Sequence, residues 1–407
     1  MRSRAAWFAV LAWASLYAPA AAQTVLSERE AIARFSQDSP RAKAVRASAD
    51  VARAQVSTIG RWPNPRLTVE RESVAGVAEV LTTVLQPLPI TGRQSLERES
   101  ATAQADAAAH RADEEVRRLR ADLRRAYAAL AVAQVREREI TAAGERLQAL
   151  VGILERREAA GDAAGFDRLR AEREAIDLET ELAMATDERV RAQIRLAGFF
   201  AIGTEPATLV AEAPRPASQE LPPLDALVAQ ATGARGELLA LQKDADAARL
   251  SLRAAEKRRI PEPEVIGGTK SSSSAGGRLG SVFGVQAVLP LFDDGRPERA
   301  LAEAQANQAM ARLEALRLTL RSEIAGLRAT TIERRRMAER YREVAARNSG
   351  SIERIAQVSY DAGERGILEL LDAYRTSSAA RIRQAALDAD AREAEIELEF
   401  VSGLEIP

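Results

Sequence analysis

The sequence predicts a mainly α-helical protein with a small β part, built from two tandem repeats that each hold two β-strands and one long antiparallel helical hairpin. The first observation is a set of proline and glycine motifs that recur about 200 residues further along the chain. Pro63-Asn64-Pro65 matches Pro261-Glu262-Pro263, and Gly92-Arg93 matches Gly295-Arg296. The second is a set of long runs with heptad-spaced apolar residues. The third is an aromatic content of only 4%, which suits long helices packed through small side chains.

The bulk composition excludes several function classes. The 407 residues carry 58 Lys and Arg against 59 Asp and Glu, so no basic excess indicates nucleic acid as a partner. Cysteine is absent, and His110 is the only histidine, which removes disulfides, a Cys nucleophile and the usual transition-metal ligands. We therefore expect no catalytic residues, no metal site and no cofactor.

The N-terminus predicts a signal peptide over residues 1–22. Arg2 and Arg4 precede an apolar stretch from Ala5 to Ala18, and Ala20-Ala21-Ala22 forms a cleavage site before Gln23. A membrane-anchor helix is the alternative, but the apolar stretch is short and ends at a proline. Without cysteine, the mature N-terminus cannot carry a lipid on a first-position Cys.

Each repeat is predicted to begin with a helix that stops at its Pro-x-Pro step, because proline cannot continue a helix. These helices cover about 41–60 and 235–259. Two strands follow, at about 66–72 and 80–86 in the first repeat and about 264–270 and 281–289 in the second, where a Ser/Gly-rich loop over 271–277 joins them. In the last strand Phe283, Val285, Ala287 and Leu289 share one face, a lipid-out, lumen-in pattern.

A helical run of about 65 residues, roughly 100 Å long, follows Gly92 and again Pro297. Glycines at the expected turns, Gly161 and Gly363, let each run fold back as a hairpin. The first outgoing helix is predicted to pack through Val116, Leu119, Leu123, Ala126, Leu130, Ala133, Ile140, Leu147, Val151 and Leu154. Its return helix is predicted to pack through Leu169, Ile176, Ala183, Val190 and Ala197. The second run is predicted to pack through Met310, Leu313, Leu320, Ile324, Leu327, Tyr341, Ala345, Ile352 and Ile355.

The predicted organisation therefore has four parts. A first repeat covers 23–200, with its strands at about 66–87 and its hairpin at about 95–200. A proline-rich linker over 201–223 lies at the waist of the hairpins. A second repeat covers 224–407, with strands at about 264–289 and a hairpin at about 297–401. Two strands alone leave open edges and bury too little, so we expect closure by oligomerisation: three copies would supply a twelve-stranded transmembrane β-barrel on an α-helical barrel.

The order of these elements resembles the TolC outer-membrane factor family over essentially the whole mature chain. Each copy has Pro-x-Pro, two strands, Pro-Leu and Gly-Arg, a long helix, and then Ala-Gly followed by an acid six residues after the glycine. The segments most similar to the heavy-metal efflux (CzcC-like) branch are Pro63-Asn64-Pro65, Gln86-Pro87-Leu88-Pro89 with Gly92-Arg93, and Leu289-Pro290-Leu291-Phe292-Asp293.

The resemblance implies a homotrimeric duct in the bacterial outer membrane that extends into the periplasm and carries no enzyme activity. It implies contact with outer-membrane lipid, a periplasmic membrane-fusion adaptor that docks at the hairpin tips, Gly161 and Gly363, and an inner-membrane efflux pump of the RND type. Motif alignment around Gly363 implies gate links among Tyr360, Arg365 and Asp167.

The same alignment implies an entrance constriction formed by Glu369 and Asp372, although the family commonly has Asp where this chain has Glu369. Acids that approach their symmetry mates at a three-fold axis repel one another unless a cation lies between them, so such a ring favours cations. The alternative is that Asp167, Glu369 and Asp372 are ordinary solvated residues at helix starts, where acids suit the helix dipole.

Two other function classes compete with the duct. A soluble periplasmic coiled-coil adaptor or scaffold would share the signal peptide and long hairpins, but adaptors usually have one hairpin within β-rich modules. A secreted enzyme is the third class, and no nucleophile-base pair, phosphate loop or metal cluster supports it. The transported substrate stays open, with metal cations suggested by the resemblance alone.

Overall fold

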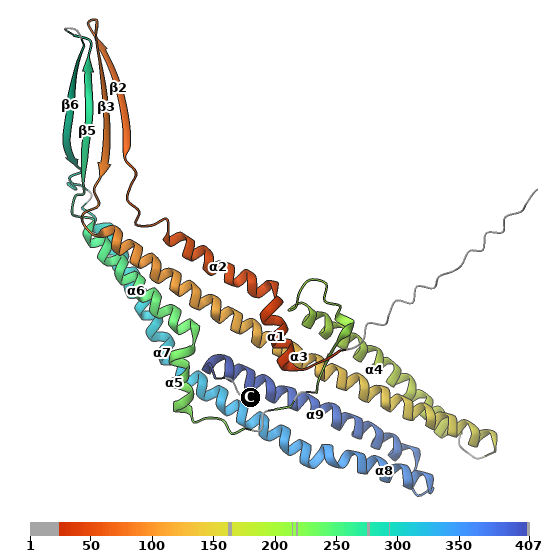
Figure 1. The fold of residues 1–407 in the computed structure, drawn as a ribbon. Coiled ribbons are helices and arrows are strands. Elements are labelled where there is room, and N and C mark those ends of the chain that lie inside the picture. The colour runs from red at the N-terminus through yellow and green to blue at the C-terminus, as the bar shows by residue number, and fades with distance from the viewer. Residues whose placement is uncertain are drawn as a thin grey trace, which may run out of the picture.

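The computed structural model describes residues 24–161, 165–213, 215–216, 219–274, 277–292 and 294–404. The predicted signal peptide over 1–22 therefore lies outside the described residues. The chain is elongated, with a β-sheet at one end and the tips of two helical hairpins at the other (Figure 1).

The first part of the chain corresponds to the first predicted repeat and contains strands as well as helices. Its elements are β1 (Thr24–Leu26), α1 (Glu28–Asp38), α2 (Pro40–Val56), β2 (Arg66–Val74), β3 (Val77–Pro87), α3 (Arg93–Ala159) and α4 (Gly165–Ala197). The second part follows the same order after a short connection. Its elements are η1 (Pro206–Thr208), β4 (Leu209–Ala211), α5 (Leu224–Ala234), α6 (Gly236–Lys257), β5 (Pro263–Ser272), β6 (Arg278–Ala287), α7 (Arg296–Tyr341), η3 (Arg342–Ala346), α8 (Arg347–Asp361) and α9 (Ile367–Ser402).

The larger sheet has four antiparallel strands in the order β2-β3-β5-β6, so the two β-hairpins join edge to edge through β3 and β5. Gly268 permits this pairing, because a Cβ at that position would lie 2.2 Å from the carbonyl oxygen of Thr82. β6 ends at Ala287, two residues before the predicted end at Leu289. The reason is that Ala287 pairs with Pro263, the first residue of β5, and no partner strand continues beyond it.

A second, two-stranded sheet was not predicted. β1 and β4 pair in parallel, with Val25 opposite Val210. The Tyr127 hydroxyl of α3 joins them by donating to the Leu26 carbonyl at 2.7 Å and accepting from the Glu212 amide at 2.9 Å. The segment 201–223, predicted to be wholly irregular, therefore contains a short helix and a strand.

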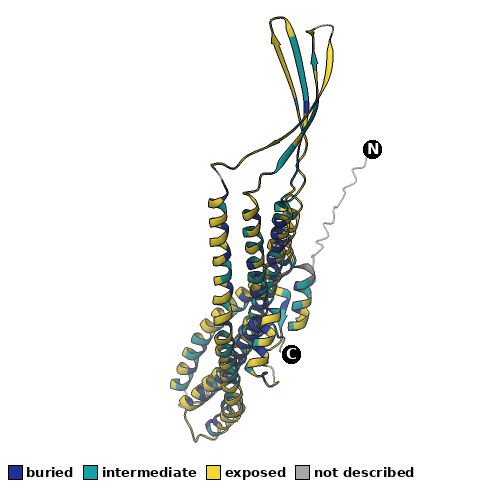
Figure 2. Cartoon of the chain, turned by 90° about the vertical axis from the view of Figure 1, so that its left-hand side faces the viewer, coloured by how far each residue is buried: buried dark blue, intermediate teal, exposed yellow. Residues whose placement is uncertain are grey.

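Long helices form the rest of the molecule. α3 has 67 residues and packs along α2, α4, α6 and α9. In the second repeat the outgoing helix continues from α7 through the short π-helix η3 into α8, and α9 returns along it. Figure 2 shows buried residues concentrated along the packed helices, whereas the strands are mostly exposed or half-buried.

The packing face predicted for α3 is correct, whereas the one predicted for the return helix is wrong. Leu123, Leu130, Leu147 and Leu154 of α3 are fully buried. On α4, by contrast, the leucine and isoleucine stripe faces outward: Leu169 is 60% exposed, and Ile176 and Val190 are exposed as well. The side chains that α4 buries are Ala171, Ala175, Ala185, Ala192, Gln193 and Leu196.

The physical reason is that α4 carries two apolar stripes, and its alanine stripe allows the closer approach to α3. The second run repeats this pattern in part, since Leu313, Leu320 and Ile324 are buried while the predicted Ile352 and Ile355 are exposed. None of the described helices contains an apolar stretch of the length that crossing a bilayer requires.

Candidate functional site

Both hairpins turn at a glycine with a left-handed backbone, as predicted. Gly161 has φ +92° and Gly363 has φ +73°. In the second tip the Gly363 amide donates to the Tyr360 carbonyl at 2.9 Å, and the Glu364 amide donates to the Ser359 carbonyl at 2.9 Å. These two bonds form a Schellman motif, which ends α8 and sets the direction in which α9 starts.

The predicted gate residues Tyr360 and Asp167 lie on facing hairpins. The Tyr360 ring is buried in a cluster with Leu154 and Ala171 of the first hairpin and Ile367 of its own. Burial raises the pKa of Tyr360, and the nearby Asp167 carboxylate raises it further. The Tyr360 hydroxyl has no hydrogen-bond partner in the part of the chain that the structure describes.

Arg365 lies elsewhere, in a groove of about 500 Å³ between α8 and α9 that Glu369 and Asp372 also line. Both acids are exposed, and their three-residue spacing puts them on one face of α9. The structure therefore gathers Arg365 with the two predicted constriction acids. Within the described residues it places no ion pair between Arg365 and Asp167.

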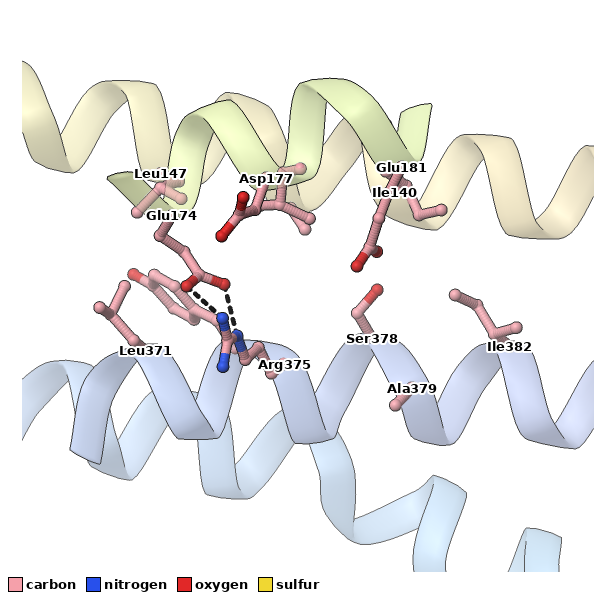
Figure 3. Close-up of a pocket in the computed structure, with 13 residues that line it drawn as sticks. Ile140, Leu147, Glu174, Asp177, Glu181, Leu371, Arg375, Ser378, Ala379 and Ile382 are labelled. Carbon is pink, nitrogen blue, oxygen red and sulfur yellow. Dashed lines mark hydrogen bonds and ion pairs between the residues drawn. The ribbon is translucent and has the colours of Figure 1, made fainter. Parts of the chain in front are cut away.

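A second groove, of about 460 Å³, separates the two hairpins between α4 and α9 (Figure 3). Glu174, Asp177 and Glu181 project from α4 toward it, and Arg375 projects from α9 to meet Glu174. The Arg375 guanidinium donates from two nitrogens to the two carboxylate oxygens of Glu174. The floor of this groove is apolar and consists of Ile140, Ala143, Leu147, Leu178, Leu371, Ala379 and Ile382.

A further set of links crosses between the hairpins around one acid of α8. The Glu353 carboxylate accepts from Arg146 of α3 at 3.0 Å and from Arg381 of α9 at 2.9 Å. Arg381 also reaches Glu139 of α3 at 3.0 Å. Sequence reasoning identified none of these contacts, because no spacing in one chain says which helices will lie side by side.

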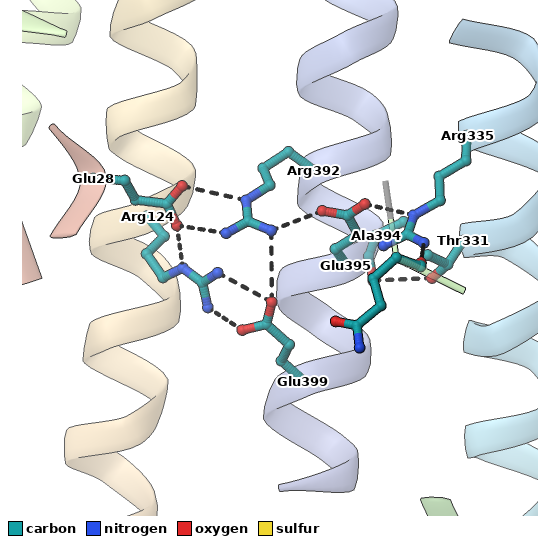
Figure 4. Close-up of polar contacts among 9 residues, drawn as sticks. Glu28, Arg124, Thr331, Arg335, Arg392, Ala394, Glu395 and Glu399 are labelled. Carbon is teal, nitrogen blue, oxygen red and sulfur yellow. Dashed lines mark hydrogen bonds and ion pairs between the residues drawn. The ribbon is translucent and has the colours of Figure 1, made fainter. Parts of the chain in front are cut away.

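The waist of the molecule contains a buried network of acids and arginines (Figure 4). Glu28 of α1 accepts from Arg124 of α3 at 2.5 Å and from Arg392 of α9 at 3.1 Å. Arg124 also forms a bidentate pair with Glu399. Arg392 continues to Glu395 at 2.7 Å, and Glu395 is fully buried and also accepts from Arg335 of α7 at 2.6 Å. The network joins four helices.

Burial and neighbouring charges together set the pKa values of the acids in this network. Burial alone would raise the pKa of Glu28, but the Arg392 and Arg124 guanidinium groups overcome it and hold the pKa below its ordinary value. The pKa of Glu399 is raised by burial, which Arg124 and Arg392 offset only in part. Both acids are therefore sensitive to the integrity of the same arginine pair.

The four-stranded sheet has two chemically different faces. The register aligns Leu67, Val84, Gly267 and Phe283 on one face, where Phe283 is 84% exposed. Arg71, near the strand tips, is the only charged residue of the described strands on this face. The opposite face carries Arg66, Glu70, Glu72, Glu79, Glu264, Lys270 and Arg278. Within the described residues no cluster of three or more His, Cys, Asp or Glu side chains has the geometry to hold a metal ion.

These features define a class of protein. Two long α-hairpins, a sheet with one apolar and one charged face, and acids gathered at the hairpin tips are the parts of a channel subunit that spans from a membrane into an aqueous compartment.

The comparisons with known proteins agree with this class. Residues 227–404 match the family model of the outer membrane efflux protein. The cobalt-zinc-cadmium resistance protein CzcC of Cupriavidus metallidurans is 26% identical over 328 residues, which cover 79% of this chain and 76% of the relative.

Solved structures share the fold over nearly the full length. A membrane protein from Pseudomonas aeruginosa superposes with a TM-score of 0.77 at 20% identity, covering 92% of each chain. The outer membrane protein VceC from Vibrio cholerae does so with a TM-score of 0.74 at 18% identity, covering 93% of this chain and 97% of that one. Residues 227–404 of the chain thus match the outer membrane efflux protein family, and the chain as a whole shares the fold of these solved structures. The chain is an outer-membrane channel that extends into the periplasm, and it is a transport duct rather than an enzyme.

Proposed function

We propose that three copies of this chain form the exit duct of a tripartite efflux system, with a twelve-stranded β-barrel in the outer membrane and an α-helical barrel in the periplasm. The observation that carries this proposal is the two-faced sheet at the end of the hairpins. Its strands have 9, 11, 10 and 10 residues, and a tilted membrane-spanning strand needs about 9 to 11.

The sheet also requires partners. β2 and β6 are its edges, and each exposes a row of unpaired backbone groups that cannot stay unpaired in lipid. Joining β6 of one copy to β2 of the next removes both edges. Three copies of four strands then close a cylinder whose charged face lines the lumen.

The outward stripe of α4 supports the same assembly in the periplasm. Leu169, Ile176 and Val190 of this stripe are spaced by multiples of seven residues. On the other flank of the chain, the exposed Met337 and Val344 are also seven residues apart. The charges near the two stripes differ in sign. Residues 172–188 hold seven acids and one arginine, whereas residues 332–354 hold seven arginines and four acids. Two different complementary flanks make a head-to-tail contact, which closes as a ring.

We assign the entrance of the duct to the hairpin tips. Glu369 and Asp372 form its constriction. Tyr360, Arg365 and Asp167 are assigned as gate links between the tips of the assembled trimer, since within one subunit Arg365 lies away from Asp167. The turns at Gly161 and Gly363 are the docking points for a periplasmic membrane-fusion adaptor. An inner-membrane pump of the RND type delivers the substrate to this adaptor. The repeat boundaries at 23–200, 201–223 and 224–407, and a signal peptide over 1–22, belong to this proposal.

Heavy-metal cations are the substrate class that we propose. The relative from Cupriavidus metallidurans is named for cobalt, zinc and cadmium resistance, and two exposed acids per chain at the entrance would concentrate cations around a three-fold axis. A conduit needs no binding pocket for its cargo, so selection would rest mainly with the pump.

The test is to purify the chain without residues 1–22 and to measure its molar mass in detergent by light scattering and its conductance in planar bilayers. We expect a trimer that requires detergent and forms ion-conducting pores. A monomer that stays soluble in water without detergent would reject the duct in favour of a periplasmic adaptor or scaffold.

A further inference from the structure

An apolar collar surrounds the level at which the strands meet the helices. We define the collar as Trp62, Ile90, Val288, Leu289, Leu291 and Phe292, which lie in the loops between α2 and β2, β3 and α3, and β6 and α7. All six are 65% or more exposed, and Phe292 is completely so. No charged residue occurs from Leu279 to Phe292, so the collar continues the apolar face of the sheet.

A basic pocket of about 390 Å³ opens directly below the collar, between the end of α6 and the start of α7. Arg259, Arg296 and Arg299 line it, together with the acids Asp294 and Glu256. Asp294 also lies two residues after Phe292, so the pocket and the collar share one loop.

Two of the three arginines have no acidic partner among the residues that the structure describes. Arg296 pairs with Asp294 at 2.7 Å, and the neighbouring Arg258 pairs with Glu298 at 3.0 Å. Arg259 and Arg299 form no ion pair with any residue that the structure describes, in contrast to Arg258 and Arg296 beside them. Exposed guanidinium groups beneath an apolar surface are placed to bind phosphate, because their forked donors match its oxygens.

We propose that this pocket binds the headgroup of a membrane phospholipid, with the phosphate on Arg259 and Arg299, a primary ammonium group on Glu256, and the acyl chains against Leu291 and Phe292. The proposal rests on the outer-membrane position given above. It adds a specific lipid site at the periplasmic rim of the sheet, in a chain that has no cysteine to carry a lipid.

Zwitterionic phosphoethanolamine is the headgroup that fits this lining. Its phosphate would meet the two unpaired arginines, and its ammonium can donate hydrogen bonds to Glu256, which a quaternary choline cannot do. An apolar anchor and a paired headgroup act together, so a free phosphate ion should bind far more weakly than the lipid.

The experiment uses the detergent-purified trimer and native mass spectrometry, with dioleoyl-phosphatidylethanolamine, the matching phosphatidylcholine, and inorganic phosphate as probes. We expect the phosphatidylethanolamine to be retained, and Arg259→Ser with Arg299→Ser to weaken retention by about fivefold or more, since two charge-assisted contacts are lost. The matched control is Arg138→Ser with Arg312→Ser, which removes from the helices two exposed arginines that form no ion pair within the described residues and should leave retention unchanged.

Two further variants separate the parts of the site. Phe292→Ser should weaken retention of both lipids, and Glu256→Gln should remove the preference for ethanolamine over choline. Equal retention by the parent and the double arginine variant would overturn the site, and displacement by equimolar inorganic phosphate would reduce it to an anion site without lipid. Bilayer conductance of the same samples reports the duct separately: pores without lipid retention reject this inference alone, whereas absence of pores and trimers rejects the proposed function.

Discussion

Arg375 of α9 forms an ion pair directly with Glu174 of α4. Its bidentate pair with Glu174 bridges the groove between the hairpins, and the Glu174 side chain is largely buried while Arg375 is mostly exposed. Arg173, its counterpart in the first repeat, instead pairs with Asp177 on its own helix at 2.6 Å. The two equivalent arginines therefore have different tasks, one between hairpins and one within a helix.

We predict that Arg375→Ala makes the duct open more often. Losing a pair of this kind costs about 1 kcal/mol or less, and 1 kcal/mol shifts a closed-to-open equilibrium about fivefold. Single-channel recording in bilayers measures the open probability. Arg173→Ala is the control and should leave it unchanged. If both variants behave alike, Arg375 does not hold the hairpins together.

The exposed acids Glu369 and Asp372 carry the second prediction at this scale. Glu369→Gln with Asp372→Asn removes six negative charges from a trimer, so the entrance should lose its preference for cations and its block by divalent cations. Reversal potentials in a salt gradient measure the preference. Glu364→Gln, a nearby tip acid outside the groove, is the control. A double variant with the parent's selectivity would show that the two acids are ordinary solvated residues.

At the scale of the elements, α1 is attached to the hairpins by its buried Ala31 and Phe35 and by the ion pairs of Glu28. A Ser27 cap starts the helix, and Glu28 in its first turn reaches Arg124 and Arg392 across two other helices. Because the pKa of Glu28 lies below its ordinary value of 4.5 in the folded chain, its contribution to stability is present above that pH and is lost as the pH falls through the folded pKa. The raised pKa of Glu399 acts in the opposite sense, since its contribution is lost as the pH rises.

We therefore predict that α1 loosens in acid. The protection factors of amide hydrogen exchange over 28–38, which correct for the pH dependence of the intrinsic rate, should fall as the pH drops below about 4.5, and Glu28→Gln should show low protection already at pH 7, with a loss of about 1–3 kcal/mol in the free energy of opening. Asp50→Asn, which removes an exposed pair with Arg53 on α2, is the control. Exchange in the Glu28 variant that matches the parent at pH 7 would contradict the attachment.

For the whole molecule, the outward stripe of α4 predicts where subunits meet. Ile176→Glu places a charge in the middle of this stripe, and burying an unpaired carboxylate between subunits should dissociate the trimer. Light scattering in detergent measures the molar mass. Ile176→Leu keeps the apolar surface and should remain trimeric. A trimeric Ile176→Glu variant would place the subunit contact on another face.

Much of the fold follows from local features of the sequence. Pro-x-Pro steps, Gly161 and Gly363 mark the ends of helices because proline and glycine act on their own backbone, and strands appear where the two Pro-x-Pro steps indicated them. The candidate tip residues could be named for a similar reason, since they lie at fixed offsets from the turn glycine. The buried face of α4 could not be predicted this way.

The sequence by itself determined the repeated plan, the lengths of the helices, the turns and the two-faced pattern of the strands, because each depends on neighbours along the chain. Only the tertiary structure decided that β3 pairs with β5, that the alanine stripe of α4 faces α3, and that Glu28, Arg124 and Arg392 meet at the waist. When a helix carries two apolar stripes, its sequence alone does not determine which of the two is buried within its own chain. That choice depends on how closely the backbones can approach, and a buried charge finds its partner only after the helices have packed.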